Sequence, residues 1–438
     1  MKWPILPSLT GPMARHSSAT LCTRLFGVSC GFLYAVVVAR LLGPRGYGVV
    51  AVAISSATVI ATLSVVGAGD LAIRETAALS TRKAWDELRL FVGWSIRTVL
   101  KISVAAAALM AAASLLPTPY ASALLLGSAT VPLLALLQVL KGVVQGSGAV
   151  VRAQLPLDVV RWIITLALLA FLLLTNSPAT PLAVLLIIVI GLSLALVTSA
   201  ALLRRFLRSI PMAAGASLAA NEWLFQSLPF LAIALFGIIG TEIGTLLLGL
   251  LSGPREAGLY QPIAKLAPLM MLGNGAIEAA LAPRLASSWE ANDVPTLQRL
   301  VRHSVVASAA VTSAICVAIV LASPYILRAF GPDFAKYGGL IVWLGVAQVL
   351  NAATGAAPLL LAMTGDMKRR IRAQVVTMVV QVGLGLAFIP KLGAVGAVIS
   401  LVAAILVWSL LHWWLALRTT GIDTSLISVF ASRKKSRS

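Results

Sequence analysis

Five charged side chains lie inside long apolar stretches of the sequence or at their ends: Arg24, Asp70, Glu242, Lys265 and Glu278. An ionisable group in hydrocarbon costs roughly 2 kcal/mol or more, so it usually pairs with an opposite charge or faces a water-filled cavity. A cation in such a cavity suits an anionic substrate, and a carboxylate there can carry H⁺ or Na⁺. Arg24 and Lys265 are therefore candidates for substrate binding. Asp70, Glu242 and Glu278 are candidates for ion coupling.

Structural roles remain open for the same residues. Arg24 and Asp70 lie near the matching ends of consecutive apolar runs, and Glu242 and Lys265 lie at similar depths in a later pair of runs. Each pair is compatible with a buried salt bridge as well as with a cavity role. A long basic side chain can also extend along the apolar surface to reach the polar boundary of a membrane.

Motifs for catalysis and for cofactors are absent or lie in the wrong context. The sequence contains no Gly-Lys dipeptide and therefore no phosphate-binding P-loop, and His16, His303 and His412 lack metal-ligand spacing. Residues 27–31 match the pattern Gly-x-Ser-x-Gly, but this nucleophile motif needs a strand, a turn and a helix, whereas these residues lie in an apolar run. We therefore expect no enzyme, no metal and no cofactor.

The elements that carry the charged residues are predicted membrane spans. The chain has 438 residues, of which 59% are hydrophobic and 11% are charged, against roughly 45–50% and 25% in soluble proteins. About twelve nearly uncharged runs approach the roughly 20 residues that cross a bilayer core. They are 20–39, 47–69, 98–116, 121–140, 159–175, 182–203, 224–251, 259–281, 305–327, 338–363, 373–389 and 394–417. We predict an all-α polytopic membrane protein with about 12 transmembrane helices.

The net charge of +20, from 34 Lys and Arg against 14 Asp and Glu, is a topology signal. Most of the basic residues fall in alternate connections between runs, which are expected on the cytoplasmic side. The pattern places both termini in the cytoplasm and indicates attraction to anionic lipids of the bilayer. No nucleic-acid partner is expected, and we expect the first run to be retained as a span because no cleavage site follows it.

An internal repeat divides the chain into two halves. Gly43-Pro44-Arg45 follows the first run of one half, and Gly253-Pro254-Arg255 follows the first run of the other. Arg152-Ala153-Gln154 and Arg372-Ala373-Gln374 precede the two fifth runs at a nearly constant offset. Repeats of this kind are typical of transporters. We predict two parallel six-helix bundles, residues 1–203 and 222–417, with a cytoplasmic linker, 204–221, and a basic cytoplasmic tail, 418–438.

Several segments resemble one known family. Residues 39–48, Ala-Arg-Leu-Leu-Gly-Pro-Arg-Gly-Tyr-Gly, followed by Gly67 and Arg74-Glu75, are similar to the opening of the polysaccharide biosynthesis (Wzx-type) flippases. Residues 242–266 and 283–286 resemble spans seven and eight of the same family, with Glu242 where many relatives carry Asp. These flippases belong to the multidrug/oligosaccharidyl-lipid/polysaccharide (MOP) exporter superfamily.

The resemblance implies a V-shaped pair of bundles around a central cavity. It implies alternating-access transfer of an undecaprenyl-pyrophosphate-linked oligosaccharide across the bacterial cytoplasmic membrane, coupled to H⁺ or Na⁺ and assisted by a polysaccharide polymerase and other assembly proteins. A multidrug cation antiporter of the superfamily is the main alternative, and an acidic cavity would favour it. A lipid II flippase would need two further spans, and a membrane glycan polymerase or ligase would need a folded outer loop.

Overall fold

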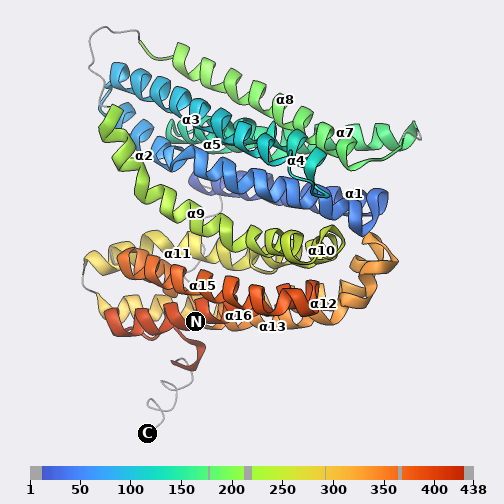
Figure 1. Cartoon of the computed structure of the whole chain (residues 1–438). Coiled ribbons are helices and arrows are strands. Elements are labelled where there is room, and N and C mark those ends of the chain that lie inside the picture. Colours follow the sequence, from blue (N-terminus) through green and yellow to red (C-terminus); the bar gives the residue numbers. More distant parts are fainter. Residues whose placement is uncertain (1–11, 176–177, 212–219, 292, 364–366, 429–438) are drawn as a thin grey trace. The chain divides into compact units, whose positions relative to one another are not determined.

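The computed structural model describes residues 12–175, 178–211, 220–291, 293–363 and 367–428. Within these ranges the chain is helical and has no β-strand (Figure 1). Nine helices of the described chain are long and apolar enough to cross a membrane. The predicted all-α polytopic class is confirmed. Much of the predicted linker and the end of the basic tail lie outside the described residues.

Each of the runs in the sequence has a helical counterpart, although fewer helices qualify as complete spans. Helix α1 (Pro12–Val65) contains the first run and most of the second, and it is interrupted between them at Gly43, whose backbone leaves the helical region at φ 63° and ψ 178°. Helices α10 (Pro254–Met270) and α11 (Leu272–Glu290) divide one later run between them. Helices α13 (Gly338–Ala353) and α14 (Ala357–Met363) divide another.

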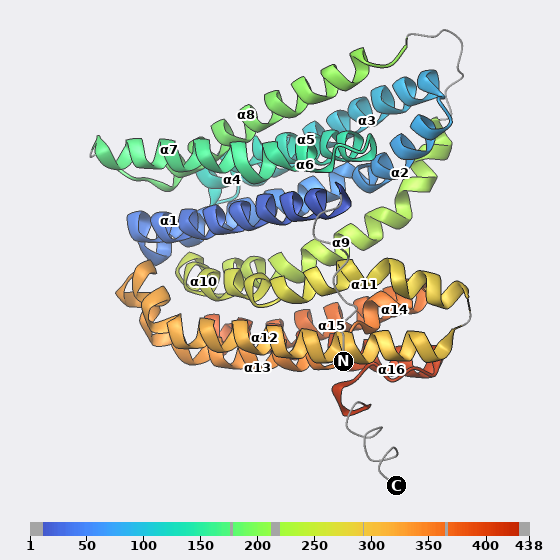
Figure 2. The same ribbon diagram turned by 180° about the vertical axis from the view of Figure 1, so that it is seen from behind.

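The chain separates into two compact units, residues 1–238 and 239–438, called unit 1 and unit 2 below. In unit 1, α5 packs against α1, α2, α3 and α8, so its Ala135, Leu137, Val139 and Val143 side chains are fully buried (Figures 1 and 2). The elements after α1 are α2 (Ala68–Thr81), α3 (Trp85–Ala113), α4 (Ala121–Ser128), α5 (Thr130–Gly146), α6 (Val150–Leu155), the π-helical turn η1 (Pro156–Val160), α7 (Arg161–Leu174) and α8 (Pro181–Arg208).

The first part of α9 (Ala220–Leu251) packs in unit 1. The Trp223 ring lies 5.3 Å from the Phe91 ring and 5.5 Å from the Trp94 ring of α3. The Arg74 Nη2 of α2 donates to Gln226 Oε1 at 2.6 Å. The boundary between the units therefore falls inside α9, whereas the sequence places the second bundle from residue 222.

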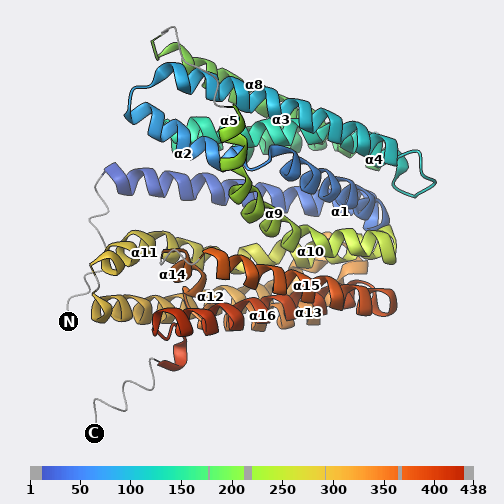
Figure 3. The same ribbon diagram turned by 60° about the vertical axis from the view of Figure 1, so that its left-hand side comes forward.

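Unit 2 is built on two helix pairs. Helix α15 (Met367–Leu392) packs along α16 (Ala394–Thr420), and α12 (Val294–Phe330) packs along α13 after the short turn η2 (Pro332–Tyr337) (Figure 3). The chain after α16 folds back: Asp423 accepts from Trp413 Nε1 at 2.8 Å, and Thr424 Oγ1 donates to the Thr354 carbonyl at 2.7 Å. This contact covers the break between α13 and α14.

Candidate functional site

A close crossing of α2 and α5 in unit 1 brings two charges together. A Cβ atom on Gly142 of α5 would collide with the Gly69 carbonyl of α2, and one on Gly69 would touch the backbone of Gln138. Glycine at both positions lets the helices approach until their backbones meet. The neighbours of these glycines, Asp70 and Lys141, consequently lie within electrostatic reach of each other.

A second close approach joins α1 to the turn η1 and to α7. A Cβ atom on Gly27 would lie 3.0 Å from the Asp158 Cβ, and one on Gly31 would lie 3.0 Å from the Trp162 ring. The pattern that mimics a nucleophile motif therefore serves helix packing. The π-helical turn begins at Pro156, which cannot donate a backbone hydrogen bond. Such turns rotate the following side chains and occur frequently at functional sites.

These two crossings assemble the charged cluster of unit 1: Arg24, Asp70, Lys141, Asp158 and Arg161. Lys141, Arg161 and Arg24 all interact electrostatically with the Asp158 carboxylate, and Lys141 also interacts with Asp70. Arg24 and Asp70 are exposed, whereas the other three side chains are partly buried. Within the described residues, no ion pair shorter than 4.0 Å joins any two of them. Three cations and two carboxylates thus share one region without being locked into pairs.

Aromatic rings position the most deeply placed cation of this cluster. The guanidinium of Arg161 lies 4.1 Å from the centroid of the Trp162 ring, a cation–π geometry. The Tyr34 ring of α1 lies 5.5 Å from the same Trp162 ring, and Tyr34 interacts electrostatically with Arg161. The rings restrict the motion of the guanidinium, so Arg161 presents its charge from a defined place in the cluster.

In unit 2, Glu242 and Lys265 lie in different surroundings. Glu242 of α9 is partly buried and interacts electrostatically with the fully buried Tyr260 of α10. A neighbouring hydrogen bond of 2.7 Å joins Gln261 Nε2 to Thr245 Oγ1. Lys265 is exposed on α10 and makes no ion pair in the part of the chain that the structure describes.

Glu278, on α11 of unit 2, belongs to a more polar group. Its Oε1 accepts from Asn274 Nδ2 at 3.0 Å, and Arg370 of α15 acts on it electrostatically. Arg370 also acts on His412 of α16, which is completely buried and whose Nδ1 lies 2.8 Å from the Trp408 carbonyl. This group contains Arg370, which was not among the predicted site residues, and His412, which was considered only as a metal ligand.

The structure thus brings two of the predicted site residues into one cluster with three residues that were not predicted. Arg24 reaches Asp158 and Asp70 reaches Lys141, so the two candidates share one cluster without pairing directly. Asp158 and Arg161 flank the start of the predicted run 159–175, where basic residues are ordinarily attributed to topology. The signal in the sequence was that Pro156 is closely followed by Asp158 and Arg161 in an otherwise apolar segment.

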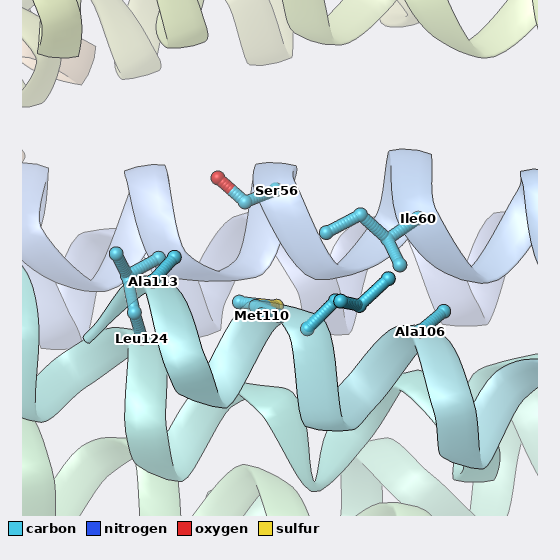
Figure 4. Close-up of a pocket in the computed structure, with 7 residues that line it drawn as sticks. Ser56, Ile60, Ala106, Met110, Ala113 and Leu124 are labelled. Atoms are coloured by element: carbon cyan, nitrogen blue, oxygen red, sulfur yellow. The ribbon is translucent and has the colours of Figure 1, made fainter. Parts of the chain in front are cut away.

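A pocket elsewhere in unit 1 has a different character. It lies between α1, α3 and α4, has a volume of about 390 Å³, and is lined by Ser56, Ile60, Ala106, Leu109, Met110, Ala113 and Leu124 (Figure 4). Its lining is apolar except for one hydroxyl, and it includes no member of the charged cluster. It offers no counter-charge to an ionic substrate.

Comparisons with known proteins give a family and a fold. The sequence model described as "Polysaccharide biosynthesis protein" matches residues 14–289. A search of curated protein sequences gives no match.

Solved structures similar to this chain include MATE and MOP transporters. An inward-facing multidrug resistance MATE family transporter of the MOP superfamily is 14% identical, with a TM-score of 0.72 over 91% of this chain and 97% of that one. A MOP superfamily transporter from Pyrococcus furiosus, described as having a binding pocket of reverse polarity, is 14% identical, with a TM-score of 0.65 over 95% and 98%. The MATE multidrug transporter DinF-BH is 15% identical, with a TM-score of 0.64 over 97% and 99%.

Proposed function

Because the chain belongs to the polysaccharide biosynthesis protein family and has the fold of MOP superfamily transporters, we propose that it is a flippase for a lipid-linked oligosaccharide. The substrate is a polyprenyl-pyrophosphate-linked glycan, moved from the inner to the outer leaflet of the bacterial cytoplasmic membrane. The polyprenyl chain stays in the bilayer while the pyrophosphate and the sugars cross along the protein by alternating access.

The charged cluster of unit 1 is the observation that carries this proposal. Lys141, Arg161 and Arg24 outnumber the two carboxylates, so the cluster has an excess of positive charge. A pyrophosphate entering low dielectric needs a counter-charge, and a guanidinium binds phosphate oxygens in a bidentate way. The absence of tight ion pairs among the described members leaves these cations able to turn from Asp158 to an incoming anion.

The carboxylates supply candidate coupling groups. Asp70 stands in the cluster itself, whereas Glu242 and Glu278 are in unit 2. Binding of H⁺ or Na⁺ at a carboxylate changes the local charge by one unit and so changes the affinity for an anion nearby. A membrane potential that is negative inside also drives an anion outward, by about 2.3 kcal/mol per charge at 100 mV.

Leaflet exchange in liposomes tests the proposal. The purified full chain is reconstituted, and transfer of a fluorescent undecaprenyl-pyrophosphate oligosaccharide is compared with transport of a fluorescent organic cation, with and without an ion gradient. We expect transfer of the lipid-linked sugar alone. Transport of the cation alone would reject the flippase and assign the protein to multidrug export.

Two control variants distinguish a role of the charged cluster in transport from an effect on protein stability. The Arg161→Lys variant keeps the charge and loses the fork of the guanidinium, so it should retain part of the activity that Arg161→Gln loses. The Arg45→Gln variant removes an exposed charge outside the cluster and should transfer substrate at the normal rate. The proposed assembly partners are a polysaccharide polymerase and associated proteins, and co-purification of the intact protein with them tests that part.

A further inference from the structure

One exposed face of α3 carries two basic side chains that make no ion pair with any described residue. Arg97 and Lys101 are exposed, stand one helical turn apart, and make no hydrogen bond or ion pair within the described residues. Around them Leu100 and Val104 are also exposed, at 41% and 51%. The acidic residues of α3, Asp86 and Glu87, lie in its first turn, far along the helix from both cations.

The length of α3 places these two charges below the membrane surface. A span needs about 20 residues at 1.5 Å each, so counting back from the last helical residue, Ala113, puts the hydrocarbon boundary near Trp94, four residues before the apolar run 98–116 that the sequence predicts. Arg97 and Lys101 then lie about 5 Å and 10 Å inside it.

Helix α8 gives an independent check of this level. The same count from Pro181 puts its boundary near Ala200, so Arg204, Arg205 and Arg208 lie among the lipid headgroups. The Arg89 Nη2 of α3 donates to the Leu207 and Ile210 carbonyls at 2.7 Å and 3.0 Å, which ties the two helix ends together. Helices α3 and α8 both pack against α5 (Figures 1, 2 and 3). The hydrocarbon boundary counted along α3 and the one counted along α8 therefore lie at the same level to within about one helical turn.

We propose that this face binds an anionic phospholipid, with its phosphate held by Arg97 and Lys101 and an acyl chain lying along Leu100 and Val104. Extended toward the headgroups, the Arg97 guanidinium and the Lys101 ammonium approach the level of the lipid phosphates, where the two cations can hold one phosphate between them. The exposed arginines at the end of α8 supply positive potential on the headgroup side. Charge complementarity selects an anionic lipid over a zwitterionic one.

Lipid titration of the intact protein tests the site. The full chain in mild detergent is titrated with phosphatidylglycerol or phosphatidylcholine, and bound lipid is counted by native mass spectrometry. The Arg97→Gln/Lys101→Gln variant should lose preference for phosphatidylglycerol by about five-fold for each charge removed. A matched variant, Arg45→Gln/Lys391→Gln, removes two exposed charges away from this face and should keep the preference.

Two further measurements test whether the site binds a lipid or free phosphate, and whether the positive charge is what binds it. Inorganic phosphate should not compete with the lipid, because the acyl chain contributes to binding; full competition would replace the lipid site by a phosphate site. The Arg97→Lys/Lys101→Arg variant should keep the preference, which shows that loss in the glutamine variant is not misfolding. An unchanged preference in Arg97→Gln/Lys101→Gln, or equal losses in the matched control, would overturn the proposal.

Discussion

The two units share the conformation of one turn and differ in the charged residues that they hold. The turn after the first span has nearly the same conformation in both, with φ and ψ of 63° and 178° at Gly43 and 87° and 179° at Gly253. Proline follows each glycine, at Pro44 and Pro254. This backbone region is almost restricted to glycine, so the repeated Gly-Pro is a conformational requirement in each unit.

The fifth spans show the difference. The register that aligns Arg152 with Arg372 also aligns Arg161 with Gln381. Arg161 joins a charged cluster behind a π-helical turn, whereas Gln381 lies in the uninterrupted helix α15 and donates from Nε2 to the Gly240 carbonyl at 3.1 Å. At positions that the predicted repeat makes equivalent, unit 1 thus has a cation and unit 2 a neutral amide. Only the first can attract an anion.

The largest effect is expected from making unit 1 resemble unit 2. Arg161→Gln removes a charge-assisted contact worth about 1.5–3 kcal/mol, so transfer of a pyrophosphate-linked lipid should fall about ten- to hundred-fold. Gln381→Ala, at the equivalent position, should leave transfer per folded molecule nearly unchanged. Leaflet exchange in liposomes measures both rates. Similar losses in the two variants would contradict the idea that Arg161 binds the substrate and Gln381 does not.

Replacement of the glycine by alanine should lower the stability of the protein by a similar amount at the two Gly-Pro turns. Gly43→Ala and Gly253→Ala each place a side chain in a strained backbone region, at about 1–3 kcal/mol, although nothing lies within 4 Å of either new Cβ. Thermal unfolding of the purified variants should show two similar decreases in Tm. A decrease in one variant alone would mean that the two turns are not equivalent.

At another pair of glycines, replacement by alanine should change the stability of the protein in opposite directions. The register that aligns Gly43 with Gly253 aligns Gly27 with Gly237. A Cβ on Gly27 meets Asp158, whereas one on Gly237 meets nothing within 4 Å. Gly27→Ala should destabilise the protein by about 1 kcal/mol through crowding, and Gly237→Ala should stabilise α9 by about 0.5–1 kcal/mol. The difference in Tm between the two variants checks the close approach at Asp158.

The smallest effect concerns two helix caps. The Thr180 hydroxyl accepts from Ala183 N at 3.2 Å at the start of α8, and an Asp293 carboxylate oxygen accepts from Thr296 N at 3.0 Å at the start of α12. Hydrogen bonding by Thr296 lowers the pKa of Asp293 below its usual value. The contribution of Asp293 to stability is therefore present above the ordinary carboxyl pKa and is lost as the pH falls through the lowered one.

Variants of these caps isolate that contribution. Asp293→Asn should show a small loss of stability at neutral pH that disappears in acid, whereas Thr180→Ala should show a loss that does not change with pH. Thermal unfolding from neutral to acidic pH follows both. A loss in Asp293→Asn that persists in acid would show that its charge is not what stabilises α12.

Much of the fold could be predicted from the sequence because the residues of each span form one continuous apolar run. Runs such as 182–203 and 394–417 bury apolar surface in any membrane arrangement, and they correspond to α8 and α16. The break at Gly43 was also predictable, since proline and glycine end a helix wherever they occur together. The boundary inside α9 was not, because it depends on Trp223 reaching Phe91 and Trp94 of a distant segment.

By itself, the sequence determined the helical membrane class and the order of the apolar spans, since hydropathy and turn chemistry act over a few residues. Only the tertiary structure decided which charges meet. Arg24, Lys141 and Asp158 come from three separate elements, and their proximity depends on backbone contacts at Gly27 and Gly142. Helix crossings of this kind are set by close packing between distant segments, which no local pattern in the chain specifies.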